Sequence, residues 1–273
     1  MRKPSFSHLT SLSQAPPDLI DFVADASYES TGIRLCPAVD GGVAYPLNAQ
    51  SQTFKRTMER LKARHIAVLD IEVMLLQSHT QVRDFESALA IGAQMGAKRI
   101  CVNGEDQDLN RFTQTWGQIC ELAAQFDMQV DLEFMVWRPI KTLQIAVDIV
   151  QKAGCSNGKV LVDALHLFRS GGSVAEVRAV DPRFLGALQL CDGPLKGPHP
   201  QDTQAILAEA RSGRSPPSEG EFPLIELIQA MPLTSPISVE VPMTITPRFE
   251  NEIERVKHVL EAATRCIEQS GLD

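Results

Sequence analysis

The chain has 273 residues, of which 44% are hydrophobic and 22% are charged, and its formal net charge at pH 7 is −8. These proportions match an average soluble globular protein and exclude an intrinsically disordered chain. The acidic charge argues against a nucleic-acid-binding surface, which requires a clustered basic excess. No stretch reaches the roughly 18 apolar residues of a membrane span. The composition therefore suits an enzyme for small polar substrates, and we expect neither a nucleic-acid partner nor a membrane partner.

The cysteines and the first residues bear on the compartment. Disulfide frameworks belong to short, cysteine-dense secreted chains, and structural zinc sites need closely paired ligands. Residues 1–17 contain a basic pair with no apolar segment behind it, which is not the pattern of a secretory signal. We therefore expect free thiols and a cytoplasmic protein. The six cysteines are scattered singly, without a CxxC pair: Cys36, Cys101, Cys120, Cys155, Cys191 and Cys266.

Short apolar runs alternate along the chain with longer segments of helical periodicity. The first helical segment opens with Pro16, Pro17 and Asp18, which is typical of a helix start. The predicted helices include 16–26, 82–95, 111–126 and 142–153. The predicted strands are 7–12, 31–36, 66–71, 98–103, 128–134, 159–163, 185–190 and 237–241.

The spacing of these segments indicates the fold class. Most neighbouring strands begin about 30 residues apart, which is the length of one strand-plus-helix unit. The last spacing is longer because of an insert at residues 193–222. No glycine-rich phosphate-binding motif follows any strand, so the open nucleotide-binding folds lack support. Eight such units predict an α/β protein, a single (β/α)8 TIM barrel over residues 1–273, a size that this fold needs.

Polar residues lie at the carboxyl ends of several predicted strands. In a (β/α)8 barrel these ends meet at one rim. A lone carboxylate at a strand end is more often a helix cap, and Asp163 by itself could cap the next helix. Glu133, Gln189 and Glu240, however, lie within apolar strands, where an unpaired polar group is costly. Four adjacent strands thus each supply an oxygen ligand. Glu133, Asp163, Gln189 and Glu240 predict a site for one divalent ion, Mn²⁺, Mg²⁺ or Co²⁺, with Zn²⁺ also compatible.

The same residues carry a resemblance to a known family. The succession LEFM, VDALH, QLCD and SVEVP, together with RSPPSEGEF, resembles the xylose isomerase-like TIM-barrel superfamily, which includes the AP endonuclease 2-like proteins. The resemblance spans roughly residues 7–265 and implies that Glu133, Asp163, Gln189 and Glu240 are metal ligands. Many members have histidine where this chain has Gln189, and some dehydratases have glutamine. That departure weakens an endonuclease-type site with several zinc ions.

The resemblance implies a sugar or sugar-derivative isomerase or epimerase of carbohydrate metabolism, which moves a proton next to a carbonyl through an enediolate. In that branch Glu133 and Glu240 double as ligands and acid/base groups, and His166 is a further catalytic candidate. The alternative is a metal-dependent dehydratase of a cyclic keto-polyol or 3-dehydroshikimate type, in which His166 would serve the departing hydroxyl. A barrel that binds a sugar or protein partner without turnover remains a third possibility.

Cationic residues near the rim are candidates for binding a substrate carboxylate, phosphate or enolate oxygen. They are Arg34, Arg138, Arg169 and Lys196, and His166 is a fifth substrate-binding candidate. Any one of them is more often a solvated surface charge. Trp137 is a candidate pocket wall, and Asp192 a candidate contact of a metal ligand. Residues 193–217 form a long, polar segment that suits a mobile lid or a subunit contact. A homo-oligomer is compatible with a barrel of this size, although one chain identifies no interface.

Overall fold

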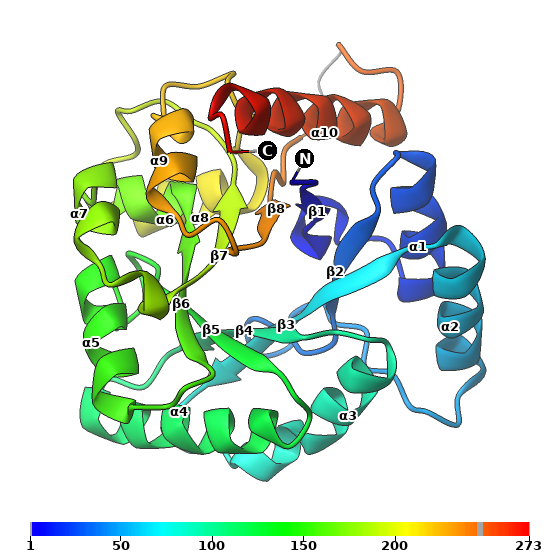
Figure 1. Ribbon diagram of the computed structural model, residues 1–273, viewed down its shortest axis with the longest axis horizontal. Coiled ribbons are helices and arrows are strands. Elements are labelled where there is room, and N and C mark those ends of the chain that lie inside the picture. The colour runs from blue at the N-terminus through cyan, green and yellow to red at the C-terminus, as the bar shows by residue number, and fades with distance from the viewer. Residues whose placement is uncertain (1, 245–247, 273) are drawn as a thin grey trace.

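The computed structural model describes residues 2–244 and 248–272 and forms a closed parallel barrel. The strands follow one another around the barrel in sequence order, and the first pairs with the last (Figure 1). This confirms the single (β/α)8 TIM barrel. The strands are β1 (Ser5–Phe6), β2 (Ser30–Arg34), β3 (Ala67–Leu76), β4 (Arg99–Gly104), β5 (Gln129–Glu133), β6 (Gly158–Asp163), β7 (Leu185–Leu190) and β8 (Ile237–Val239).

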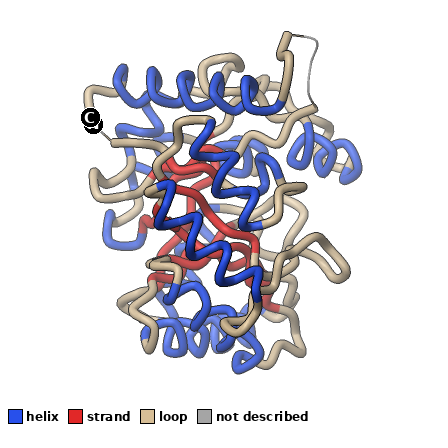
Figure 2. The backbone as a smooth tube through the Cα atoms, turned by 90° about the vertical axis from the view of Figure 1, so that its right-hand side faces the viewer, coloured by secondary structure: helices blue, strands red, loops and turns tan. Residues whose placement is uncertain are grey.

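The helices form a ring outside the strands, and α10 completes this ring beside β8 and β1, close to both termini (Figure 1). Seen from the side in Figure 2, the strands remain enclosed by helices. No helix of residues 2–244 or 248–272 is long and apolar enough to cross a bilayer. The helices are α1 (Pro16–Asp25), α2 (Gln52–Arg64), α3 (Glu86–Gln94), α4 (Leu109–Ala124), α5 (Leu143–Ala153), α6 (Ala164–Arg169), α7 (Val174–Ala179), α8 (Thr203–Ser212), α9 (Leu224–Ala230) and α10 (Glu252–Gln269).

Local sequence signals explain where several helices begin and end. The side chains of Asp108 and Thr142 accept hydrogen bonds from backbone N–H groups of the first turns of α4 and α5. Helix α5 ends at Gly154, whose φ of 69° lies in the left-handed region that favours glycine. Apolar residues on the inner faces of these helices pack against the strands in one continuous core.

The structure corrects the predicted range of the first strand. The sequence predicts a strand over residues 7–12, but the strand is Ser5–Phe6, and His8–Ser11 form a 3₁₀ helix. Two hydrogen bonds explain why the chain turns at this point. The hydroxyl of Ser7 donates to Glu240, and the backbone N–H of His8 donates to Glu72, so both point into the barrel mouth.

Other boundaries also shift. The third strand continues past residue 71 to Leu76, and the last ends at Val239 instead of 241. The segment predicted as one helix over 82–95 divides into a 3₁₀ turn, Val82–Phe85, and α3. The long segment 193–217 contains α8, which the sequence analysis did not predict.

Polar side chains also fill the lower barrel interior. Arg99 on β4 forms two hydrogen bonds with Asp131 on β5, at 2.7 and 2.8 Å. Gly186 on β7 faces this pair so closely that no space remains there for a side chain, because a Cβ atom would lie 2.0 Å from Asp131 Oδ1. A charged pair thus occupies part of the barrel interior below the site.

Candidate active site

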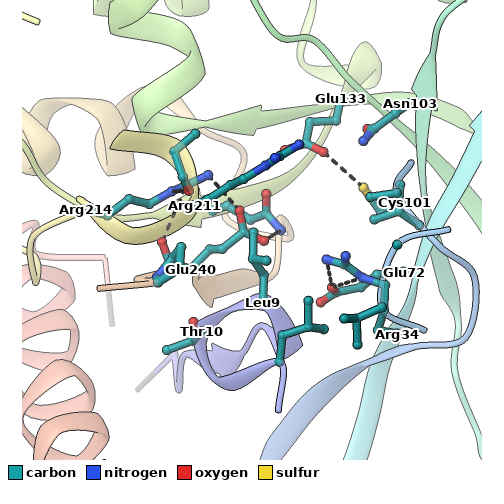
Figure 3. A pocket seen from close by; sticks show the side chains of 18 of the residues that line it. Leu9, Thr10, Arg34, Glu72, Cys101, Asn103, Glu133, Arg211, Arg214 and Glu240 are labelled. Atoms are coloured by element: carbon teal, nitrogen blue, oxygen red, sulfur yellow. Dashed lines mark hydrogen bonds and ion pairs between the residues drawn. The ribbon is translucent and has the colours of Figure 1, made fainter. Parts of the chain in front are cut away.

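A cavity of about 470 Å³ opens at the carboxyl ends of the strands (Figure 3). Its volume lies within the usual range for small-molecule sites. The apolar residues that line it include Leu9, Val39, Val73, Met135 and Trp137. The floor is polar and includes Glu72, Glu133, Gln189, Arg214 and Glu240. The cavity therefore combines apolar lining residues with a dense charged floor.

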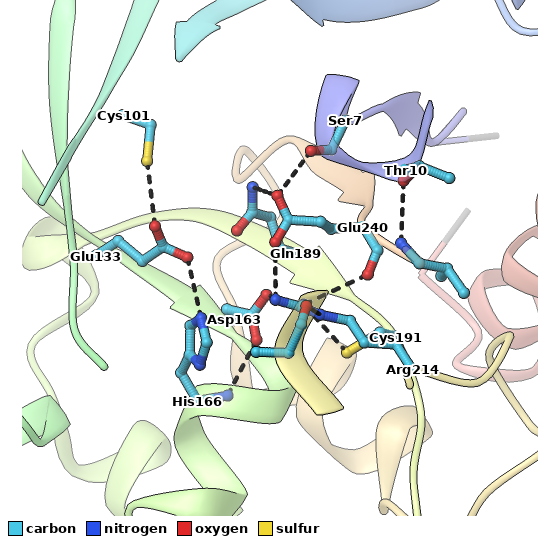
Figure 4. A network of polar contacts seen from close by, with 12 residues as sticks. Ser7, Thr10, Cys101, Glu133, Asp163, His166, Gln189, Cys191, Arg214 and Glu240 are labelled. Atoms are coloured by element: carbon cyan, nitrogen blue, oxygen red, sulfur yellow. Dashed lines mark hydrogen bonds and ion pairs between the residues drawn. The ribbon is translucent and has the colours of Figure 1, made fainter. Parts of the chain in front are cut away.

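The four residues predicted to bind metal come together under this cavity (Figure 4). Glu133 ends β5, Asp163 ends β6, Gln189 lies near the end of β7, and Glu240 follows β8 directly. All four are buried, with at most 5% of any residue exposed. Because these strands are neighbours in the barrel, their ends bring the four side chains to the same rim of the barrel. Their roles as ligands stay a prediction.

Arg214 is the main site residue that the sequence analysis missed. Its guanidinium group is buried between two of the four residues: Nη1 lies 2.6 Å from Asp163 Oδ2, and Nη2 lies 2.9 Å from Glu240 Oε2. Nε donates to the carbonyl of Ala210 at 3.0 Å. Arg214 is the first residue of the RSPPSEGEF segment, so the resemblance already contained a signal for it.

Glu240 and Gln189 face each other across the last two strands. Glu240 Oε1 accepts a hydrogen bond from the hydroxyl of Ser7 at 2.7 Å and one from Gln189 Nε2 at 3.3 Å. The amide oxygen of Gln189 is buried and has no hydrogen-bond partner among the described residues. An orphaned acceptor of this kind is costly unless a cation or a ligand donor meets it.

Glu133 faces His166 from the other side of the site. Glu133 Oε1 lies 3.5 Å from His166 Nε2, and Glu133 Oε2 accepts a long contact from Cys101 Sγ at 3.5 Å. With its amide turned to satisfy its neighbours, Asn103 donates to the same oxygen at 2.9 Å. The backbone N–H of His166 donates to Asp163 Oδ1, so Asp163 does cap α6. The cap and the predicted ligand are the same residue.

The electrostatics of the site divide its acids into two kinds. Burial, reinforced by Glu240 and Asp163, raises the pKa of Glu133 well above its usual range. For Glu240, burial outweighs the attraction of Arg214 and raises the pKa to about 7. Burial acts the same way on Asp163, but Arg214 outweighs it and lowers the pKa. Burial also lowers the pKa of His166 to about 4.

A second charged group lies on the β2–β3 side of the floor. Arg34 donates to Glu72 Oε2 through Nε and Nη2, at 3.1 and 2.8 Å. The pKa of Glu72 is lowered because Arg34 overcomes the effect of burial. Arg34, a predicted substrate-binding residue, therefore lines the cavity but already has a carboxylate partner.

The other predicted cations divide by position. Arg138 lines the cavity, and Trp137 beside it packs edge-on against His166 with ring centroids 5.0 Å apart. Arg169 instead pairs with Glu209 on α8 and donates to the carbonyl of Pro194, so it fastens the insert. Lys196 is exposed on the same insert. Neither Arg169 nor Lys196 is among the residues lining the cavity, and their positions do not support the predicted substrate contacts.

Asp192 also stabilises the insert at residues 193–222. Its Oδ1 accepts hydrogen bonds from the backbone N–H groups of Gly193 and Phe222, at 2.8 and 3.0 Å, which joins the two ends of the segment. The predicted contact of Asp192 with a metal ligand is absent from its hydrogen bonds among the described residues. A strand-end acid can thus shape a loop as well as a site.

Three buried side chains are placed to hold one divalent ion. Glu133, Asp163 and His166 offer ligand atoms that all lie within 4.8 Å of one another, and this group contains His166 in place of the predicted Glu240. The orphaned oxygen of Gln189 adds a neutral oxygen donor next to Glu240. Oxygen-rich sites of this composition suit hard cations, while the histidine also admits zinc. Arg214 balances part of the negative charge through oxygens of Asp163 and Glu240.

Comparison with known proteins places the chain in a family. Residues 22–266 match the family described as "Xylose isomerase-like TIM barrel", and the protein belongs to it. This confirms the resemblance drawn from the motifs at the strand ends. A comparison with curated proteins found no match.

Solved structures agree on the fold. A xylose isomerase-like TIM barrel/4-hydroxyphenylpyruvate dioxygenase fusion protein has a TM-score of 0.78 at 15% identity over 98% of this chain, which spans only 43% of that longer protein. The IolI protein, described with a binding zinc atom, has a TM-score of 0.74 at 14% identity, with 98% of this chain and 97% of that one covered.

Two further structures carry names of enzymes. D-psicose 3-epimerase in the presence of D-fructose has a TM-score of 0.73 at 15% identity, with 99% of this chain and 100% of that one covered. The probable 3-DHS dehydratase AsbF from Bacillus anthracis has a TM-score of 0.70 at 16% identity, with 96% and 98% covered. At these identities the likeness concerns the fold.

Proposed function

We propose that this protein is a metal-dependent isomerase or epimerase that moves a proton next to the carbonyl of a small sugar or sugar derivative. The observation that carries the proposal is the placement of two carboxyl groups. Glu133 from β5 and Glu240 from β8 line one cavity, and the unpartnered amide oxygen of Gln189 lies beside Glu240. The epimerase among the similar structures supports this choice.

Each residue has a role in this proposal. Glu133, Asp163, Gln189 and Glu240 would hold one divalent ion, Mn²⁺, Mg²⁺, Co²⁺ or Zn²⁺. When bound, such an ion acts as a Lewis acid that stabilises negative charge developing on substrate oxygens. One glutamate would remove the proton from the carbon next to the carbonyl, and the other would return a proton. Arg214 would keep Asp163 ionised and fix the orientation of Glu240, which it contacts at 2.9 Å.

A dehydratase is the second candidate, and His166 favours it. His166 lines the cavity, and its Nδ1 atom is buried without a partner among the described residues. A neutral imidazole in this position could receive the proton removed from the carbon and pass it to the leaving hydroxyl group, which departs as water. The apolar residues that line the cavity, Trp137 among them, suit the ring of a cyclic keto-polyol. The probable 3-DHS dehydratase among the similar structures is consistent with this alternative.

One experiment separates the candidates. Protein loaded with Mn²⁺ is incubated in D₂O with a panel of ketoses and cyclic keto-acids, and products are followed by NMR and ultraviolet absorbance. Deuterium next to the carbonyl in an isomer or epimer supports the first proposal. A new conjugated enone chromophore supports the dehydratase. If neither deuterium incorporation nor absorbance change occurs with any substrate, both proposals are wrong.

A matched pair of variants ties the activity to the site. Glu240→Gln keeps the shape of the side chain and removes its charge, so we expect turnover to fall by about 100-fold or more, as for loss of an acid/base group. Glu121→Gln makes the same change on the exposed face of α4 and should leave turnover unchanged. Equal turnover by the two variants would show that Glu240 takes no part in the reaction.

A further inference from the structure

The charge of the cavity opposes the charge of the whole chain. The protein has a formal net charge of −8, yet five arginines line the cavity against four glutamates. Burial in a cavity makes uncompensated charge expensive, so arginines gathered there need partners. The arginines are Arg34, Arg138, Arg211, Arg214 and Arg255.

Four of the five arginines pair with a carboxylate within residues 2–244 and 248–272: Arg34, Arg138, Arg214 and Arg255. Arg34 pairs with Glu72 at 2.8 Å, and Arg214 pairs with Asp163 and Glu240. Arg255 lies 3.2 Å from Glu252 and donates to the carbonyls of Thr10 and Val241. These contacts balance the charges of these three arginines, while the Nε atom of Arg255 is buried without a partner among the described residues. Arg211 is the cavity arginine for which the described residues supply no carboxylate partner.

Arg138 is buried but incompletely satisfied. Only 7% of the residue is exposed, and it follows β5 by a few residues. It pairs with Glu105 through Nη1 and donates from Nη2 to the carbonyl of Ala38 at 2.9 Å. Its Nε–H is buried and has no acceptor among the described residues. Glu105 thus balances the charge of this guanidinium group, and its Nε–H is an unmet donor enclosed at the cavity wall.

Arg211 approaches the same cavity from the end of α8. The residue is exposed, lines the cavity, and has no ion pair or side-chain hydrogen bond within residues 2–244 and 248–272. In Figure 3 its side chain extends over the pocket. The two arginines are close enough to repel: burial first and then the charge of Arg211 lower the pKa of Arg138. Glu105 balances the charge of Arg138, so Arg211 supplies the uncompensated positive charge at this cavity, which an anion would meet.

We propose that Arg138 and Arg211 bind an oxyanionic group, a carboxylate or a phosphate, on the substrate of this site. Guanidinium groups suit this task because their planar donors match the oxygens of both anions. The polar body of the substrate then faces the floor formed by Glu133, Gln189 and Glu240. This inference rests on the proposed function only in taking the cavity as the substrate site, because it concerns binding and not the reaction.

The test is a binding experiment with three matched polyols. D-glucitol is neutral, D-gluconate adds a carboxylate, and D-glucitol 6-phosphate adds a phosphate to a similar chain. Trp137 lines the cavity, so its fluorescence reports occupancy, and calorimetric titration gives the dissociation constants. We expect at least one of the two anions to bind about tenfold or more tightly than glucitol, as charge-assisted hydrogen bonds imply. The anion that binds more tightly shows whether the site prefers a carboxylate or a phosphate.

Variants assign the preference to the two arginines. Arg211→Gln, at an exposed position, should abolish most of the preference and leave the dissociation constant of glucitol unchanged. Arg138→Gln should do the same, with circular dichroism as the check on folding. Arg265→Gln makes the same charge change on the exposed surface of α10 and is the control.

Three outcomes would overturn the inference: glucitol binding as tightly as both anions, no saturable binding of either anion, or Arg211→Gln behaving like Arg265→Gln. Failure of the proposed reaction gives a different result. In that case no deuterium exchange occurs with any substrate, yet the preference for anions and its loss in Arg211→Gln remain.

Discussion

At the scale of single residues, Arg214 organises the site. It is the only cation that contacts both Asp163 and Glu240 among the described residues, and its side chain is 1% exposed. A buried carboxylate without a partner is strongly destabilising, because its desolvation is no longer repaid. The ionised state of Asp163 therefore depends on one side chain from a distant part of the chain.

We predict that Arg214→Met lowers the free energy of unfolding by about 3–5 kcal/mol, the usual cost of breaking a buried ion pair. Adding Asp163→Asn should recover part of this loss, since asparagine can still cap α6 without a charge. Urea denaturation of the metal-free protein measures both. Arg183→Met, at a side chain that is 75% exposed, is the control and should change stability by less than about 0.5 kcal/mol. Equal stability of the two single variants would refute the prediction.

The four predicted ligand residues were recognisable because each is a polar residue inside an apolar strand. Strand order alone then brings Glu133, Asp163, Gln189 and Glu240 together. Arg214 and Arg211 were missed for the opposite reason. They lie in the long insert, and Arg214 contacts Asp163 across 51 residues of sequence, so no local pattern predicts where its side chain points.

At the scale of elements, the barrel interior limits which residues its strands can carry. The Arg99–Asp131 pair leaves no room for a side chain on the facing strand β7, since a Cβ atom at Gly186 would lie 2.0 Å from Asp131 Oδ1 and 3.0 Å from Arg99 Nη2. The pair is held by two hydrogen bonds and cannot withdraw freely. Glycine at this position is therefore a packing requirement of the sheet.

We predict that Gly186→Ala destabilises the protein by about 1–3 kcal/mol, the usual cost of overpacking a core. Gly117→Ala is the matched control, because a Cβ atom there meets nothing within 4 Å. In the middle of α4, that change should stabilise the protein by about 0.5–1 kcal/mol. Thermal and urea denaturation measure both variants. If both variants changed the free energy of unfolding in the same direction, the lack of space at Gly186 would not explain the effect of Gly186→Ala.

The elements themselves were predictable where periodicity and length agreed. Strands β4, β5, β6 and β7 lie within a residue or two of their predicted ranges. The predicted range of the first strand, 7–12, was wrong because hydrogen bonds to distant glutamates end the strand at Phe6. Ser7 and His8 turn inward to bond with Glu240 and Glu72, and no sequence pattern distinguishes that from an exposed strand face.

At the scale of the whole molecule, an ion bound by β5 to β8 would tie together half of the barrel. Because only the folded chain assembles these four side chains, binding should raise stability by mass action. We predict that Mn²⁺ at about 100 times its dissociation constant stabilises the chelator-treated protein by about 2.7 kcal/mol. Differential scanning calorimetry measures this as a rise in Tm.

Variants make that prediction specific. Gln189→Leu removes the orphaned oxygen and should reduce the rise in Tm, while Gln201→Leu, at an exposed position of the insert, should not. An unchanged Tm of the natural chain with Mn²⁺, Mg²⁺, Co²⁺ and Zn²⁺ would contradict metal binding at this site. An equal rise in both variants would place the ion elsewhere.

The insert after β7 has a consequence for how such barrels diversify. Helix α8 ends at Ser212, so Arg211 at the cavity mouth and Arg214 in the floor are separated by only two residues. One continuous stretch thus holds the determinant of ligand charge and the support of the reactive carboxyls. Transplanting this stretch into a related barrel would transfer both properties in a single genetic event, whereas point changes elsewhere would have to acquire them one at a time.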